Sequence, residues 1–303
     1  MNILKINLFL LLILILNSCI KNEHITTESC SEEQLVSIPD PEFEQILINQ
    51  NIDSDRTING KILKSDAKKV RVLDLNKEHN FGSIEDLTGV EGFKNLTKLI
   101  AISHQITSID LSQNTLLDTL YLMDNRLKEI SFFKNPNLKS IDVQANELET
   151  IKGVFYVTSL KKLNASYNNL EYLNIANVTI ETLHVSHNLL KELTVTSATR
   201  LKNILAASNK LTPTLNVTNN TDLETLLISD NQLLEINLEH NTELTHFYSS
   251  SNQLNSLNVS YNQKLVDLKV DRNPTLTCIQ KGVSQNIPYL TLSDHQTIGS
   301  DCN

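Results

Sequence analysis

Few side chains in this 303-residue chain have the type and spacing that chemistry requires. His184 and His187 suit a metal ion by type, but three residues of strand separate them by roughly 10 Å, too far for two ligands of one ion. No GxSxG, GxxxxGK or CxxC motif occurs anywhere, so the patterns of a nucleophile elbow, a phosphate loop and a zinc site are absent from the sequence. We therefore predict a non-enzymatic protein without a catalytic residue, metal or cofactor.

One segment, NIDSDRTINGK, has a spacing that suggests calcium. Asp53, Asp55 and Thr57 fall at the first, third and fifth positions of an EF-hand loop. The glycine that such a loop needs at its sixth position is replaced by Ile58, and the glutamate at its twelfth position is replaced by Lys64. A plain polar turn is the favoured interpretation, with calcium as the alternative.

A repeat must position any functional surface. Leucine-aligned units start at Leu96, Leu117, Leu138, Leu160, Ile180, Leu201, Leu223, Leu244 and Leu265, with spacings of 20 to 22 residues. Each unit reads approximately LxxLxLxxNxLxxLxLxxNxx, as in LDTLYLMDNRLKEISFFKNPN from Leu117. A period this regular predicts a solenoid in which stacked turns share one core.

This pattern resembles the leucine-rich repeat family, in particular the short bacterial kind in which the LxxLxL half occurs twice per turn. The resemblance implies a leucine-rich repeat solenoid over residues 96–277, with short parallel strands stacked on two walls. Residues 37–95, with Asp40 as the N-cap and Pro41 as the first residue of a helix, resemble the small helical N-terminal cap and first irregular turn of internalin-like proteins.

Asparagine, with 36 residues in the chain, repeats in two columns. The first column is an Asn ladder of Asn125, Asn146, Asn168, Asn188, Asn209, Asn231, Asn252 and Asn273. An amide side chain can bridge the backbone groups that are freed where a strand ends, so we interpret this column as structural. Where His104 replaces asparagine we expect a frayed first turn. The second column is Asn114, Asn135, Asn220, Asn241 and Asn262, and it is interrupted at Tyr156, Val178 and Ala198.

The outward positions of the first wall are the candidate binding surface. They form a mixed aromatic and apolar strip of Tyr121, Met123, Tyr167, His184, Leu205, Leu227, His246 and Tyr248. Such a strip suits a protein or a glycan, whereas scattered exposed apolar side chains are also normal on a protein surface. His246 lies three turns from His184, about 14 Å at about 4.8 Å per turn, which again disfavours a shared metal.

The C-terminal segment 278–303 reads as a cap. Cys278 and Cys302 bracket it, and in an exported protein this pair predicts a disulfide that closes the cap. Cys30 is left without an assigned partner.

The N-terminus reads as a targeting segment. Residues 1–18 have a lysine, an apolar run and small polar residues, as in a signal peptide. The quartet from Leu16 to Cys19 resembles the lipobox of bacterial lipoproteins, which implies cleavage before Cys19 and its acylation with chains such as palmitate. Residues 19–36 then form a tether. Lys21 and Glu23 resemble the charged segment that accompanies display on the outer face of the outer membrane.

Together these features predict a lipid-anchored outer-membrane protein, exposed on the cell surface, whose repeats bind a protein ligand such as a host or matrix protein. One alternative is a structural envelope protein that self-associates, and another is an accessory protein that binds a surface glycan. The formal net charge of −9 argues against a nucleic-acid partner.

Overall fold

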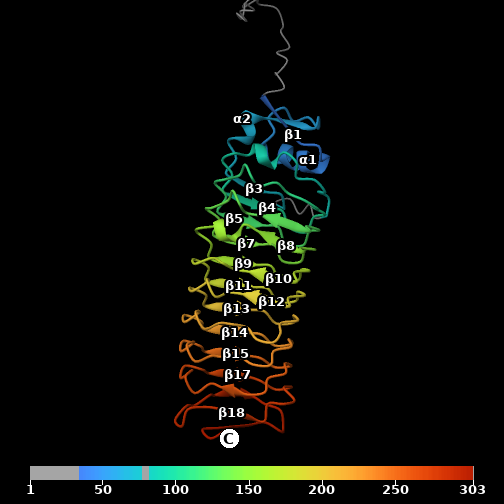
Figure 1. Cartoon of the computed structure of the whole chain (residues 1–303). Coiled ribbons are helices and arrows are strands. Elements are labelled where there is room, and N and C mark those ends of the chain that lie inside the picture. The colour runs from blue at the N-terminus through green and yellow to red at the C-terminus, as the bar shows by residue number, and fades with distance from the viewer. Residues whose placement is uncertain (1–33, 77–81, 303) are drawn as a thin grey trace, which may run out of the picture.

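The chain folds into a parallel β-solenoid of the leucine-rich repeat class, seen in the computed structural model as one tall column of stacked turns (Figure 1). The structure describes residues 34–76 and 82–302. Cys19 and Cys30, together with the predicted signal peptide and nearly all of the tether, lie outside these residues. No helix within the described ranges has both the length and the apolar character needed to cross a bilayer.

The first wall is an eleven-stranded parallel sheet to which each turn contributes one three-residue strand. Its strands are β3 (Val72–Asp74), β4 (Lys98–Ile100), β5 (Thr119–Tyr121), β7 (Ser140–Asp142), β9 (Lys162–Asn164), β11 (Thr182–His184), β13 (Asn203–Leu205), β14 (Thr225–Leu227), β15 (His246–Tyr248), β17 (Asp267–Lys269) and β19 (Tyr289–Thr291). In every one of them the middle residue pairs with the middle residue of its neighbour, so side chains of equivalent positions stack along the solenoid.

The second wall is shorter and interrupted. It comprises the pair β6 (Glu129–Ser131) and β8 (Thr150–Lys152), the pair β10 (Tyr172–Asn174) and β12 (Glu192–Thr194), and the triplet β16 (Leu257–Asn258), β18 (Cys278–Gln280) and β20 (Thr297–Gly299). A single bridge joins Thr214 to Glu235 between the last two groups. The expectation of strands on both walls is confirmed, but only the first wall is continuous.

The N-terminal cap contains β1 (Leu35–Ser37), α1 (Pro41–Asn49), β2 (Lys61–Leu63) and α2 (Lys64–Ala67). The Asp40 carboxylate accepts the Glu42 and Phe43 amides at 2.9 and 3.0 Å, so it is the N-cap of α1 as predicted. Glu44 is fully buried and accepts three amides of residues 59–61. It therefore ties the helix to the loop that leads into β2.

The core consists of stacked rows of mostly aliphatic side chains that run along the solenoid. Each row is formed by the residues at one inward-facing position of the repeat. In the unit from Leu117, the side chains of Leu117, Leu120, Leu122 and Leu127 have no exposed area. Complete burial of one leucine stabilises a fold by about 1.5–3 kcal/mol, and only neighbouring turns can supply that burial. Residues 278–303, predicted as a separate cap, continue both walls through β18, β19 and β20, and the Cys278–Cys302 disulfide is present.

Both asparagine columns are hydrogen-bonding ladders. In the first ladder Asn231 Nδ2 donates to the carbonyls of Ala206, Ile228 and Ser229 at 3.0–3.2 Å, and its Oδ1 accepts the Leu211 amide at 3.0 Å. In the second ladder Asn241 Nδ2 donates to two carbonyls of the preceding turn. The Oδ1 atom of Asn241 is buried without a partner. The two ladders thus look alike in sequence and differ in how fully their amides are satisfied.

Two features of the ladders differ from the prediction. The second ladder is not interrupted at Val178, because Asn177 donates to the carbonyls of Val154 and Val157 at 2.9 and 2.7 Å. This unit is one residue short, which shifts the asparagine by one position. The expectation of a frayed turn at His104 was wrong, since this imidazole is 5% exposed and packed beneath the cap.

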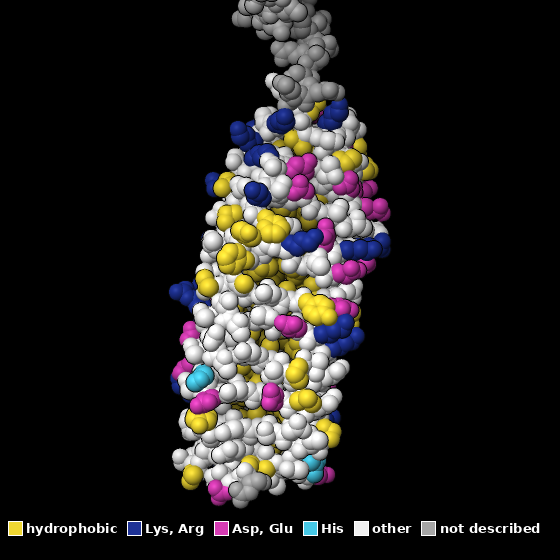
Figure 2. Space-filling view, viewed as in Figure 1, with side chains coloured by type: hydrophobic (Ala, Val, Ile, Leu, Met, Phe, Trp, Pro, Cys, Tyr) yellow, Lys and Arg dark blue, Asp and Glu magenta, His cyan; other side chains and the backbone are white. Residues whose placement is uncertain are grey.

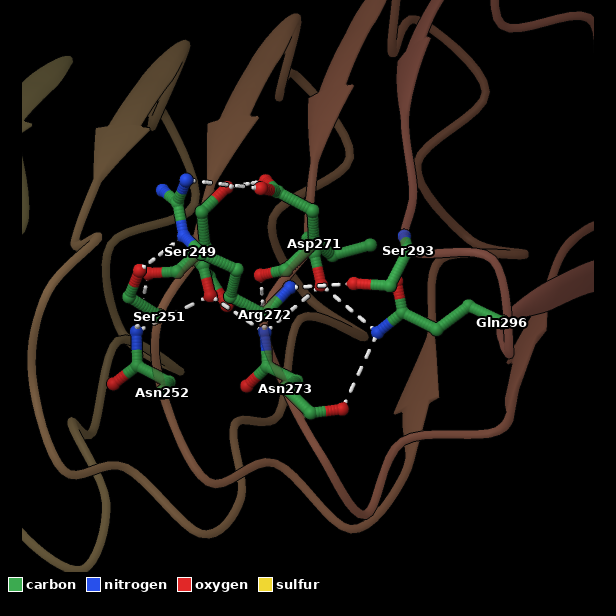
Figure 3. A network of polar contacts seen from close by, with 10 residues as sticks. Ser249, Ser251, Asn252, Asp271, Arg272, Asn273, Ser293 and Gln296 are labelled. Atoms are coloured by element: carbon green, nitrogen blue, oxygen red, sulfur yellow. Dashed lines mark hydrogen bonds and ion pairs between the residues drawn. The ribbon is translucent and has the colours of Figure 1, made fainter.

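Glutamine ends both ladders at the C-terminal end of the solenoid. Gln285 Nε2 donates to the carbonyls of Val259 and Asn262, and Gln296 Nε2 donates to the Val270 carbonyl at 3.0 Å. Figure 3 shows the Gln296 amide next to Asn273, with Asn252 on the far side of Asn273, so the longer amide continues the ladder into the last turn. Arg272 adds a link on each side, from its Nε to Ser251 Oγ at 2.6 Å and from its amide to Ser293 Oγ at 2.8 Å.

Candidate functional site

The last residues of the first-wall strands form one column of side chains, which we term the first-wall column. From β4 to β17 it contains, in order along the solenoid, Ile100, Tyr121, Asp142, Asn164, His184, Leu205, Leu227, Tyr248 and Lys269. Four predicted binding residues, His184, Leu205, Leu227 and Tyr248, stand on consecutive turns and all are partly exposed. At about 4.8 Å per turn they cover about 14 Å of the face.

Tyr121 is separated from this group by two polar turns. Asn164 is only 7% exposed, and its Nδ2 donates to Asp142 Oδ2 at 3.2 Å and to Gln144 Oε1 at 2.8 Å. This amide–carboxylate bridge divides the predicted strip into two parts. Tyr121 and Met123 form the smaller part, where Lys98 Nζ lies 5.3 Å from the Tyr121 ring centre.

Tyr248 is held in place by two charged neighbours. Its hydroxyl donates to Asp267 Oδ2 at 2.5 Å, and this hydrogen bond raises the pKa of the phenol. Lys269 Nζ lies 4.0 Å from the ring centre, within the range of a cation–π contact. An aromatic side chain that is fixed before binding loses little entropy when a partner packs against it.

The histidines do not assemble into a site. Burial lowers the pKa of His184, and the charge of Lys162 acts in the same direction, against the opposing charge of Asp142. His246 Nδ1 lies 2.8 Å from Thr245 Oγ1. Within residues 34–76 and 82–302, no group of three histidine, cysteine, aspartate or glutamate side chains is placed to hold a metal ion.

Tyr167 and His187 stack on each other at the turn that follows the first wall. Their ring centres are 4.3 Å apart, with 12° between the ring planes. Both residues have a φ of +56° and directly precede a ladder asparagine. Nine residues at this unit position share the left-handed conformation, from Ser103 to Arg272, and none is glycine. The sequence pattern does not reveal this column, because asparagine at the following position was the only regular feature there.

A second exposed surface is not among the residues predicted from the sequence. We term it the aromatic cluster: Phe133, Phe155, Tyr156 and Val178, with exposed fractions of 51–66%. The Tyr156 ring lies edge-on to Phe133 and Phe155, with centre distances of 5.3 and 5.5 Å. Hydrophobic side chains gather over the first repeats in Figure 2. The sequence feature that points to this cluster is the presence of Tyr156 and Val178 at positions where the second column otherwise has asparagine.

Solved structures show which fold this is. The functional domain of InlJ from Listeria monocytogenes is 22% identical, with a TM-score of 0.55 over 86% of this chain and 70% of that one. Internalin C2 from Listeria monocytogenes is 19% identical, with a TM-score of 0.59 over 72% of this chain and 100% of that one. The octameric complex of Latrophilin 3, Unc5D and FLRT2 contains a repeat chain that is 18% identical, with a TM-score of 0.53 and coverage of 75% and 71%. Comparison of the sequence with protein-family models and with curated proteins gave no match.

These structures define the chain as a leucine-rich repeat solenoid of the kind found in bacterial internalins, with repeats of about 21 residues. Such structural neighbours are scaffold or binding proteins, and no catalytic family is indicated. At these identities the likeness shows the fold, whereas recognition has to be argued from the surface of this chain.

Proposed function

We propose that this chain is a lipid-anchored surface protein whose solenoid binds a protein partner through the first-wall column. The observation that carries the proposal is the run of His184, Leu205, Leu227 and Tyr248 on four consecutive turns in parallel register. This run is a rigid strip with apolar centre and polar margins, the composition of many protein-binding surfaces. The FLRT2 repeats in the neighbouring structure occur in a complex with other proteins, which supports the same use of the fold.

The shape of the face favours a macromolecule over a small molecule. Its residues lie on one face of a parallel sheet, and their side chains are partly exposed rather than enclosed. A small ligand needs a concave site that covers most of its surface. The net charge of −9 disfavours a nucleic acid, whose phosphates would be repelled.

A capture experiment tests the partner and the face together. The purified chain is immobilised and exposed to extracellular matrix and serum proteins, and bound proteins are identified by mass spectrometry. The variant Leu205→Glu/Leu227→Glu places two charges in the strip and is expected to lose a specific partner. Phe155→Ala/Tyr156→Ala, which truncates the aromatic cluster, is expected to retain it. If the unaltered chain and both double variants capture the same proteins, the assignment of partner binding to the first-wall column is refuted.

The self-associating alternative predicts a different outcome in solution. Light scattering on the purified chain is expected to give a monomer across a wide range of concentrations. If the purified chain forms a dimer or larger species and the Leu205→Glu/Leu227→Glu variant is monomeric, the strip serves self-assembly and not partner recognition.

Lipid anchoring and surface display are separate parts of the proposal and rest on the sequence of residues 1–36. We expect Cys19→Ala to release the exported protein from the membrane fraction. We expect protease added to intact cells to remove the repeats, because they are displayed outward. A membrane-bound Cys19→Ala chain would refute the anchor, and complete protection from protease would refute the display.

A further inference from the structure

The second wall contains a hollow that none of the first-wall residues touches. It has a volume of about 540 Å³ and lies over β10, β12 and the segment 212–216. Its lining includes Tyr172 of β10, all three residues of β12, and Pro213 in the following turn. In Figure 2, hydrophobic, acidic and basic side chains meet on the visible face over β10.

The repeat explains why the wall is hollow at this point. β12 pairs with β10, but the next turn has Pro213, which has no amide hydrogen to donate. The unit from Leu201 is also one residue longer than the usual 21. Pairing on the second wall resumes only at Thr214 and Glu235. An extra residue and a missing donor thus interrupt the wall between two ordered stretches.

The lining combines one exposed aromatic ring with many hydroxyl groups. Tyr172 is 62% exposed. Thr194, Thr196, Thr212 and Thr214 also line the hollow, together with Asn216. A pyranose has C–H bonds on its ring faces, which pack on the negative face of an aromatic ring, and hydroxyl groups on its rim, which pair with hydroxyl and amide groups.

The charged side chains of the hollow are each held by a partner within the protein, and they leave no net positive charge. Lys191 Nζ is 2.8 Å from Glu171 Oε2 and 5.7 Å from the Tyr172 ring centre. Glu192 Oε1 accepts a hydrogen bond from Thr194 Oγ1 at 3.0 Å. No excess of positive charge is left to attract an anion, and the chain as a whole is negative. The hollow is thus matched to an uncharged ligand.

From this geometry we infer a carbohydrate subsite on the second wall, which takes one or two residues of a neutral oligosaccharide against Tyr172. The volume falls within the range of about 300–1,000 Å³ that is usual for ligand sites. The subsite is on the opposite wall from the first-wall column, so it is independent of the proposed protein-binding face. A glycan and a protein can therefore be bound at once.

Calorimetric titration of the purified chain with defined sugars tests the subsite. The probes are cellohexaose, laminarihexaose, chitohexaose and a mannohexaose, with hexagalacturonic acid as the charged comparison. At least one neutral hexasaccharide is expected to bind, and Tyr172→Ala is expected to weaken that binding by about tenfold or more, the usual consequence of losing an aromatic contact. Thr196→Val, which removes a hydroxyl and keeps the shape, is expected to weaken it as well.

Two controls make the result specific. Tyr261→Ala removes a tyrosine of similar exposure, 50%, that lies outside the hollow, and it is expected to leave binding unchanged. Tyr172→Phe keeps the ring and is expected to keep most of the affinity. The inference fails if no neutral hexasaccharide binds at millimolar concentration, if only hexagalacturonic acid binds, or if Tyr172→Ala binds as well as the unaltered chain.

Discussion

Replacing the two asparagines Asn231 and Asn241 by leucine should have very different costs, although both are buried. Asn231 Oδ1 is the acceptor of the Leu211 amide, which has no other partner among the described residues. By contrast, the two carbonyls bonded by Asn241 also accept backbone amides of their own turn. Asn241 Oδ1 itself is buried without a donor.

The magnitudes follow from which groups are left unpaired. In Asn231→Leu the buried Leu211 amide is orphaned, which costs about 1–3 kcal/mol, and the loss of three shared bonds brings the total to roughly 2–4 kcal/mol. In Asn241→Leu no backbone group is orphaned and an unpaired oxygen disappears, so the net cost is about 0–1 kcal/mol. The side chain with less exposed area, Asn241 at 0% against Asn231 at 7%, is thus the cheaper one to replace.

Urea unfolding followed by circular dichroism measures the two free energies, with the slope of the transition checked for each variant. Hydrogen exchange at Leu211 provides a local measurement that does not depend on two-state unfolding of a repeat protein. Protection at Leu211 is expected to fall in Asn231→Leu and to be unchanged in Asn241→Leu. An equal or larger cost for Asn241→Leu would show that the unpaired oxygen is not a liability and that the reasoning is wrong.

Three further predictions concern the cap, the turn before the aromatic cluster and the disulfide. Burial lowers the pKa of His104 in the folded protein, against the opposing charge of Asp40. The unfolded chain therefore binds a proton at this histidine more readily than the folded chain does, starting near the ordinary pKa of 6.5. Stability should therefore fall as pH drops below 6.5, and less steeply in His104→Leu, as measured by urea unfolding at several pH values. Gly153→Ala should destabilise the fold by about 1–3 kcal/mol, because φ is +78° and a Cβ atom would lie 2.7 Å from the Phe133 amide nitrogen. Its control is Gly82→Ala, which has the same φ without the contact. Cys302→Ser should cost about 3 kcal/mol by loop entropy, and no change in unfolding would contradict the stabilising role.

The periodic part of the structure could be predicted from the sequence because periodicity is itself the cause of the fold. A leucine that recurs every 20 to 22 residues has no burial except against its equivalents, so register, core and stacking follow together. The N-cap at Asp40 and the disulfide at Cys302 were predictable for local reasons, a capping side chain and a pair of cysteines.

The departures from the period could not be predicted in the same way. Asn177 takes the place expected for Val178 because a short unit shifts the register, and one repeat does not show where the missing residue lies. The division of the first-wall column at Asn164 depends on a side-chain bridge to Asp142 and Gln144, whose existence the spacing does not encode. The hollow beside Tyr172 likewise depends on how three successive units pack, of which the first is one residue short and the last is one residue long.

The interruptions of the second wall also determine how the solenoid bears a pulling force. Both ladders and the strand pairing run along the long axis, so successive turns carry a tensile load in series (Figure 1). The second wall lacks strand pairing between β8 and β10, but the Asn177 amide still joins these two turns through the carbonyls of Val154 and Val157. The final turn is fastened covalently by Cys278 and Cys302. Tension from a partner bound to the C-terminal half would therefore pass this gap through the first wall and the second ladder, while the disulfide keeps the last turn from fraying.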